Sequence, residues 1–229
     1  MNEGKKFEHQ FHKSLEKEDF YILRLIDPPS SFGKDSTKVR FSAKNPYDFL
    51  AYKEPYLFCL ELKSVIETSV SFQTEEEAKQ KLNTSANIKW HQIESLMKAD
   101  NFNGVKPMFV INFRKTNKTY AIPIAEFITY IAKITKKSIN ESDCETMGIL
   151  IPQTLNRTSY HYNFQFIYED IHSQDRLRAT LRRICPKQMP VGISQQEYIE
   201  WYNAMFKSLE TITELLETTT ENGTKKGSI

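Results

Sequence analysis

The segments Asn45-Pro46-Tyr47-Asp48 and Glu61-Leu62-Lys63 decide how this chain is interpreted. Between them, residues 56–60 form an apolar run that predicts a buried strand, and a buried strand normally excludes charge. Because side chains alternate along a strand, Glu61 and Lys63 are expected on one face and Leu62 on the other. Two ionisable groups that continue such a strand need a chemical reason. Two carboxylates that bind a hard divalent cation beside an amine would supply it.

The composition describes a globular protein. The chain has 229 residues, of which 39% are hydrophobic and 12% aromatic, enough for a real core. The 31 basic and 29 acidic residues give a formal net charge of +2, which neither demands nor excludes nucleic-acid binding. Cys59, Cys144 and Cys185 show neither metal spacing nor a disulfide framework, which favours a reducing cytosol. No signal peptide or membrane-spanning stretch is found, so we expect a cytoplasmic protein without a membrane partner.

Hydrophobic periodicity predicts a mixed α/β core. Helices are expected at residues 4–18, 87–99 and 126–137, and the polar segment around Glu75-Glu76-Glu77 is also expected to be helical. Strands are expected at residues 20–26, 47–51, 56–64, 107–113 and 119–124. That order of elements is typical of a mixed sheet flanked by helices.

The region beyond residue 140 gives weaker signals. Alternating aromatic and polar residues predict a strand at 160–168, and a short arginine-bearing helix is expected at 173–183. Ser194 and Glu197 have the spacing of a capping box, which predicts a helix to residue 216. We therefore expect a core domain at residues 1–138, a mainly helical extension at 139–217 and a frayed tail at 218–229.

The motifs, taken in order, resemble the PD-(D/E)XK nuclease superfamily and, within it, the RecU-type Holliday junction resolvases. Gly4-Lys5-Lys6-Phe7-Glu8 is similar to the family's first helix, and Asp48 with Glu61-Leu62-Lys63 matches its central motif. Ser71-Phe72 and Trp90-His91-Gln92-Ile93-Glu94 are similar to the segments that follow. The likeness covers residues 4–130. It implies a restriction-endonuclease-like fold.

The resemblance also implies a site and a reaction. Asp48, Glu61 and the carbonyl of Leu62 would hold Mg²⁺, with Mn²⁺ as a substitute, since oxygen ligands suit hard ions. Lys63 would orient or deprotonate the attacking water, Glu8 would complete the acidic cluster, and Gln92 would position phosphate or water. The expected enzyme is a Mg²⁺-dependent endodeoxyribonuclease that resolves junctions in recombination or repair, in a bacterial cell or a phage-infected host.

Contacts with DNA are expected from two basic groups of residues. Lys34, Lys38, Arg40 and Lys44 give the loop at 27–44 a local basic excess, and Arg178 and Arg182 stand in the predicted helix at 173–183. A solvated helix face explains these arginines equally well. The expected partner is branched or duplex DNA, and a homodimer suits a junction because a junction presents two related cleavage sites.

Other interpretations remain open. Asp48 taken singly fits a turn at a strand end, Glu61 and Lys63 fit an exposed cross-strand pair, and Glu8 fits a surface charge. The interval at 27–44 is short for the family's protruding stalk, and Tyr47 separates Pro46 from Asp48. Another nuclease of this superfamily, of restriction or repair type, is therefore an alternative, as is a non-catalytic nucleic-acid-binding module on the same fold.

Overall fold

The computed structural model describes residues 3–26, 45–184, 200, 203 and 207. It divides into two compact units, Met1–Glu169 and Asp170–Ile229, and each is described by itself. In chain order the elements are α1 (Glu3–Lys17), β1 (Tyr21–Arg24), β2 (Phe49–Lys53), β3 (Tyr56–Val65), β4 (Ser69–Ser71), α2 (Glu75–Lys79), α3 (Trp90–Asp100), β5 (Val105–Phe113), β6 (Lys118–Pro123), α4 (Ile124–Ile131), β7 (Ser138–Asn140), α5 (Glu141–Met147), β8 (Ile149–Leu150), β9 (Gln153–Asn156), β10 (Ser159–Tyr162) and α6 (Phe164–Ile184).

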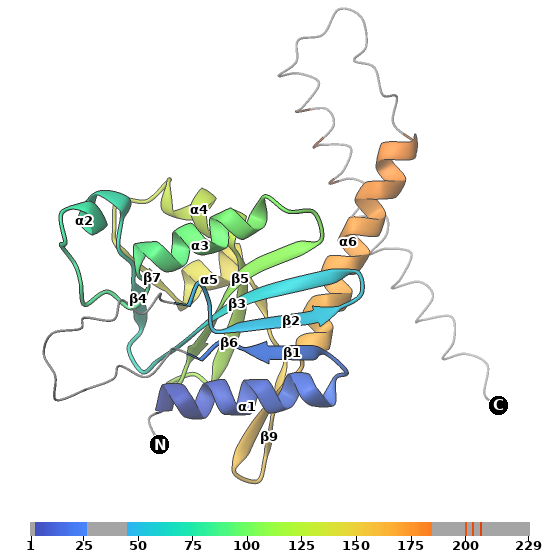
Figure 1. Cartoon of the computed structure of the whole chain (residues 1–229), viewed down its shortest axis with the longest axis horizontal. Coiled ribbons are helices and arrows are strands. Elements are labelled where there is room, and N and C mark those ends of the chain that lie inside the picture. Colours follow the sequence, from blue (N-terminus) through green and yellow to red (C-terminus); the bar gives the residue numbers. More distant parts are fainter. Residues whose placement is uncertain (1–2, 27–44, 185–199, 201–202, 204–206, 208–229) are drawn as a thin grey trace, which may run out of the picture. The chain divides into compact units, whose positions relative to one another are not determined.

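A six-stranded mixed sheet forms the centre of the first unit, in the order β1-β2-β3-β5-β6-β8. Among the described strands of this sheet, β3 and β5 are the one parallel pair, and the crossover between them includes α3. Figure 1 shows α3 and α4 along one side of the sheet and α1 along the other. The predicted mixed α/β class is confirmed. No helix in the described part of the chain is long and apolar enough to cross a membrane.

Each face of the sheet has its own core. On the α3–α4 face, Cys59 and Phe109 pack with Ile93 of α3 and Phe127 of α4. On the α1 face the core is aromatic: the ring of Phe164 lies 5.2 Å from that of Phe58 and 5.6 Å from that of Phe11. Buried residues on both faces require near-continuous apolar strands, and β3 meets that requirement from Phe58 to Leu60.

The structure corrects the predicted strand at residues 160–168. β10 ends at Tyr162, and α6 begins at Phe164, well before the helix expected at 173–183. Asn163 supplies the reason, because its side-chain oxygen accepts a hydrogen bond from the Phe166 N–H at 3.1 Å, as a helix cap does. Buried Phe164 and Ile167 then stand at helical spacing.

Residues 138–169 also belong to the first unit. β8 adds the last strand of the sheet, where Ile149 pairs with Ala121, and β10 packs against α1 through Tyr162 and Phe7. A Cβ on Gly148 would lie 2.9 Å from the Ala121 carbonyl oxygen, so β8 needs glycine before it. The compact unit thus runs past residue 138, and the start of the expected extension contains strands. The division of the chain by role stays a prediction.

We expect Phe164→Ala to lower the free energy of unfolding by about 3–5 kcal/mol, because it empties the centre of the aromatic core. Phe166→Ala is the matched control, since Phe166 lies two residues later in α6 and is 44% exposed. Its effect should be about 0.5 kcal/mol. Urea unfolding followed by circular dichroism measures both. Equal losses for the two variants would contradict this core.

Candidate active site

Asp48 is held where β2 and β3 stop pairing. The ladder between these strands ends at Phe49 and Leu60. Just beyond it, the Leu62 N–H donates to Asp48 Oδ2 at 2.7 Å, so the carboxylate replaces a missing ladder acceptor. The backbone of Asp48 is also bonded on both sides, because its N–H donates to Leu60 and its carbonyl accepts from Leu25. This position combines a strand end with a fixed carboxylate.

Glu61 and Lys63 point to the α3 face of the sheet, as alternation predicts. Glu61 is only 4% exposed. Its Oε1 lies 2.9 Å from Lys63 Nζ and also accepts a hydrogen bond from the side-chain amide of Gln92 on α3. The interpretation of Glu61 and Lys63 as an exposed surface pair is therefore wrong.

Gln92 is oriented by its own helix. Its Oε1 accepts a hydrogen bond from the Lys89 N–H at 2.9 Å, at the first turn of α3. The carbonyl end is thus occupied, and the NH₂ end is left to face Glu61. A capping interaction sets which side of the amide reaches the site.

Glu8 reaches the same region from α1. Its carboxylate forms an ion pair with Arg24 of β1. Burial raises its pKa, and the charge of Asp48 raises it further while Arg24 opposes the rise. Arg24 was missed in the sequence analysis. The only sequence signal for it is a charged residue inside the apolar segment at 20–26.

The pKa of the Glu61 carboxyl group is raised to about 7. Burial is the main cause, the charge of Lys63 opposes the rise, and the charge of Asp48 adds to it. Asp48 therefore lies close enough to raise the pKa of both Glu8 and Glu61, and Arg24 and Lys63 are the cations paired with these two carboxylates. Such a perturbed cluster is typical of a functional site.

A cavity of about 170 Å³ opens on this cluster. Its wall includes Asp48, Glu61, Gln92, His91 and Tyr47. Within the described ranges, no group of three or more His, Cys, Asp or Glu side chains is placed to hold a metal ion. The side-chain donors are the two carboxylates of Asp48 and Glu61. The expected metal set of two carboxylates and one backbone carbonyl stays a prediction.

The structure does not test the expected DNA contacts. Lys34, Lys38, Arg40 and Lys44 lie outside the described residues. Arg178 and Arg182 lie in the part of α6 that belongs to the second unit. Of the predicted site residues, the structure joins Asp48, Glu61, Lys63 and Gln92 through contacts, and Glu8 through its charge.

Comparison with known proteins places the chain in a family. The model of the family described as Recombination protein U matches residues 64–165. A curated relative, the SPbeta prophage-derived uncharacterized protein YotM of Bacillus subtilis (strain 168), is 30% identical over 190 residues, which cover 77% of this chain and 90% of the relative. The chain belongs to the RecU family. This membership supports a nuclease of the resolvase kind.

The RecU match overlaps the likeness expected from the sequence in residues 64–130. It reaches residue 165, beyond the expected limit at 130, and so includes the β9–β10 hairpin. It begins at Ser64, one residue after Lys63, so the roles given to Asp48, Glu61 and Lys63 rest on their own geometry. Among solved structures, Hjc, a Holliday junction resolvase of the archaeal hyperthermophile Archaeoglobus fulgidus, aligns with a TM-score of 0.41 and 15% identity, over 64% of this chain and 94% of that chain.

We expect stability to respond to pH through Glu61. Its folded pKa of about 7 lies above the ordinary value of 4.5, so folding favours the protonated form. Its contribution is present below pH 4.5 and is lost as pH rises through 7. Glu61→Gln should therefore gain stability relative to the wild type across this interval.

Melting temperatures in EDTA, measured at several pH values for both proteins, test this expectation. Glu94→Gln serves as the control, because Glu94 lies on the exposed side of α3 and pairs with Lys98. A constant difference between Glu61→Gln and the wild type from pH 4.5 to 7 would refute the raised pKa.

Proposed function

We propose that this RecU-family protein is a metal-dependent endonuclease that cuts branched DNA, with Holliday junctions as its preferred substrate. The observation that carries the proposal is the Asp48 carboxylate held against the Leu62 N–H, beside the ion pair that buried Glu61 forms with Lys63. A fold gains no stability from a buried carboxylate placed next to a second, half-buried one, so the arrangement points to chemistry.

The acidic groups fit Mg²⁺ or Mn²⁺. Asp48 and Glu61 offer hard oxygen donors, and their mutual repulsion is relieved by a cation. The carbonyl of Leu62 would join them, because the N–H and C=O of a strand residue point the same way and the N–H meets Asp48. Bound there, the ion would supply Lewis-acid activation of water and offset charge on the phosphate.

The remaining residues position the reacting groups. Lys63 would present its ammonium to a phosphate oxygen, held in place by Glu61 at 2.9 Å. Gln92 would hold the carboxylate of Glu61 in one orientation through its fixed amide. Glu8, anchored by Arg24, would complete the negative side of the site.

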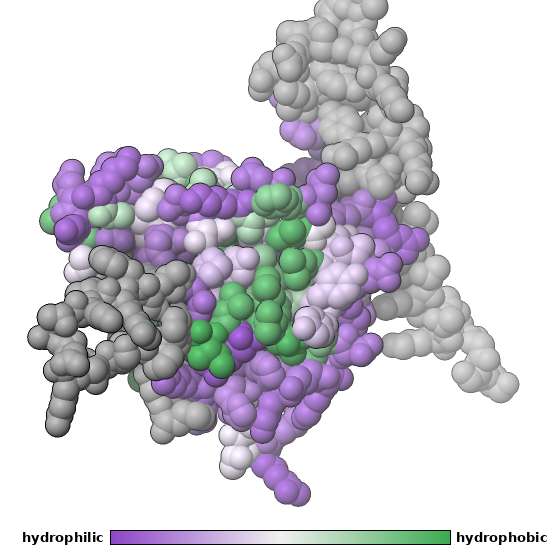
Figure 2. Space-filling view, in the orientation of Figure 1, coloured by the Kyte–Doolittle hydropathy of each residue, from purple (hydrophilic) through white to green (hydrophobic). Residues whose placement is uncertain are grey.

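A homodimer is part of the proposal, and an apolar surface supports it. β1 and β2 pair Leu23 with Leu50 and Tyr21 with Tyr52, so these side chains share one face. Leu23, Tyr21 and Tyr52 are exposed, and Figure 2 shows hydrophobic residues gathered in a band over this part of the sheet. β1 ends the sheet among the described strands. A second copy would cover this band. The cytoplasm is the proposed location, since DNA is the substrate.

Cleavage assays test the reaction. The purified protein is incubated with a synthetic four-way junction, a linear duplex or a single strand, each with Mg²⁺, Mn²⁺ or EDTA. Paired symmetric nicks on the junction alone are expected. Equal cutting of the linear duplex would favour another nuclease type, and binding without cleavage would favour a non-catalytic module.

We expect Asp48→Ala to reduce junction cleavage by at least about 100-fold, because it removes a metal ligand and frees the Leu62 N–H. DNA binding in EDTA should change little. Asp100→Ala, at the exposed end of α3, is the control and should cut normally. Cleavage by Asp48→Ala at the wild-type rate would remove the basis of the site.

We expect Leu23→Glu to convert a dimer into a monomer, because it buries a charge in the apolar band. Light scattering coupled to size-exclusion chromatography measures the mass. Leu155→Glu is the control, since Leu155 is also exposed but lies on β9. A monomeric wild type, or a dimeric Leu23→Glu, would exclude this interface.

A further inference from the structure

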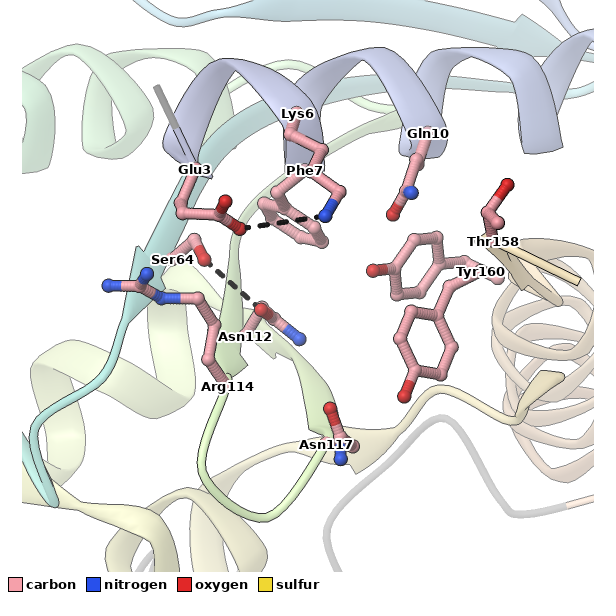
Figure 3. Close-up of a pocket in the computed structure, with 11 residues that line it drawn as sticks. Glu3, Lys6, Phe7, Gln10, Ser64, Asn112, Arg114, Asn117, Thr158 and Tyr160 are labelled. Atoms are coloured by element: carbon pink, nitrogen blue, oxygen red, sulfur yellow. Dashed lines mark hydrogen bonds and ion pairs between the residues drawn. The ribbon is translucent and has the colours of Figure 1, made fainter. Parts of the chain in front are cut away.

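A second polar hollow lies on the flank of α1 opposite Glu8. Two cavities of about 230 and 250 Å³ lie between α1 and the β9–β10 hairpin, and both include Lys6, Gln10 and Tyr160 in their walls. Figure 3 shows the side chains of Lys6 and Gln10 on α1 above the hollow and Tyr160 below them. Arg114 lies near Ser64 and Asn112, at the end of the hollow away from Tyr160. We call this the α1–hairpin groove. Because residues two apart on a helix point nearly opposite ways, Glu8 is excluded from it.

The floor of the groove is a polar row in the middle of the sheet. Ser64, Asn112 and Thr119 are direct neighbours on β3, β5 and β6. Ser64 Oγ donates to Asn112 Oδ1 at 3.1 Å, and Asn112 Nδ2 donates to Thr119 Oγ1 at 2.9 Å. An apolar row would suit these central strands better, as in the adjacent row that contains Val110. A polar floor is what a polar ligand requires.

The walls of the groove are basic. Lys6, Lys13 and Lys17 are exposed and stand on one side of α1 at helical spacing. Lys6 forms an ion pair with Glu3 at 3.9 Å. Lys13 and Lys17 have no carboxylate partner among the described residues. Burial lowers the pKa of His161 in the same wall, and the charge of Lys17 lowers it further. The groove therefore attracts anions.

Arg114 adds a cation at the inner end. Its Nε is buried and has no hydrogen-bond partner within the described part of the chain. A buried guanidinium N–H without an acceptor costs free energy, and a phosphate oxygen would satisfy it. Arg114 thus marks an anion position beside the polar floor.

Tyr160 supplies a partly exposed aromatic surface between the two cavities. Basic side chains with an aromatic ring among them are the pattern that binds single-stranded nucleic acid. Each cavity is smaller than the roughly 300 Å³ at which small-molecule pockets begin, but the two share Lys6, Gln10 and Tyr160 and so form one groove along α1, a shape that suits an extended chain.

We propose that the α1–hairpin groove binds a single strand of DNA, with Lys6, Lys13 and Arg114 on its phosphates and Tyr160 stacked on a base. This inference rests on the proposed function, because the bound strand is taken to be part of the branched DNA that the enzyme cuts. α1 would carry Glu8 toward the strand to be cut and its lysines toward another strand of the same branched substrate.

Fluorescence anisotropy with a short dye-labelled oligodeoxythymidine in EDTA tests the groove without any cleavage. Lys6→Ala/Lys13→Ala should reduce the slope of log affinity against log salt by about 1.4, since each phosphate contact on a single strand contributes about 0.7. Tyr160→Leu should weaken binding about tenfold, whereas Tyr160→Phe should bind as the wild type does, because stacking needs only the ring.

The matched control is Lys79→Ala/Lys133→Ala, which removes two exposed lysines outside the groove and should leave binding unchanged. Circular dichroism confirms that each variant is folded. If the wild type does not bind the oligonucleotide, or the groove variants bind it normally, this inference is overturned. Junction cleavage by the wild type with Mg²⁺ is recorded separately. If the wild type binds the oligonucleotide but does not cut the junction, the proposed function is overturned and the binding inference still stands.

Discussion

The hydrogen bond from the Leu62 N–H to Asp48 is the interaction on which the site depends. The pairing of β2 with β3 ends at Phe49 and Leu60, so the Leu62 N–H has no partner in the ladder. Buried without any acceptor, this N–H would cost about 1–3 kcal/mol. Asp48 satisfies it and is fixed as a result. Since alternation directs Glu61 and Lys63 from the same stretch of β3, one backbone contact brings the second carboxylate and the amine into place.

The electrostatics of this arrangement oppose stability. Burial and Asp48 both raise the pKa of Glu61, and Asp48 also raises the pKa of Glu8. Lys63 and Arg24 offset part of this repulsion. A leucine at position 61 would continue the apolar strand at no such cost. Proteins keep local conflicts of this kind where function requires them, so the conflict itself supports the assignment of a site.

The predictability of the site depends on the distance along the chain over which each contact acts. Glu61 and Lys63 follow from alternation within one strand, and Gln92 from a motif that resembles the RecU family. Arg24 meets Glu8 only after β1 pairs with β2, a contact between distant residues that no local pattern specifies. The strand predicted at residues 160–168 was wrong for another reason. The aromatic residues there satisfy both strand and helix spacing, and the Asn163 cap decides between the two.

α1 links the proposed catalytic and strand-binding surfaces through its three faces. Phe7 and Phe11 anchor it to the sheet, Glu8 faces the acidic cluster, and Lys6 faces the α1–hairpin groove. The aromatic anchor is shared, since Phe7 and Phe11 both contact Tyr162 at the base of the hairpin. A shift of α1 would therefore move Glu8 and the groove together. A strand held in the groove would in turn fix the position from which Glu8 approaches Asp48, so strand binding and cutting are expected to be coupled through this helix.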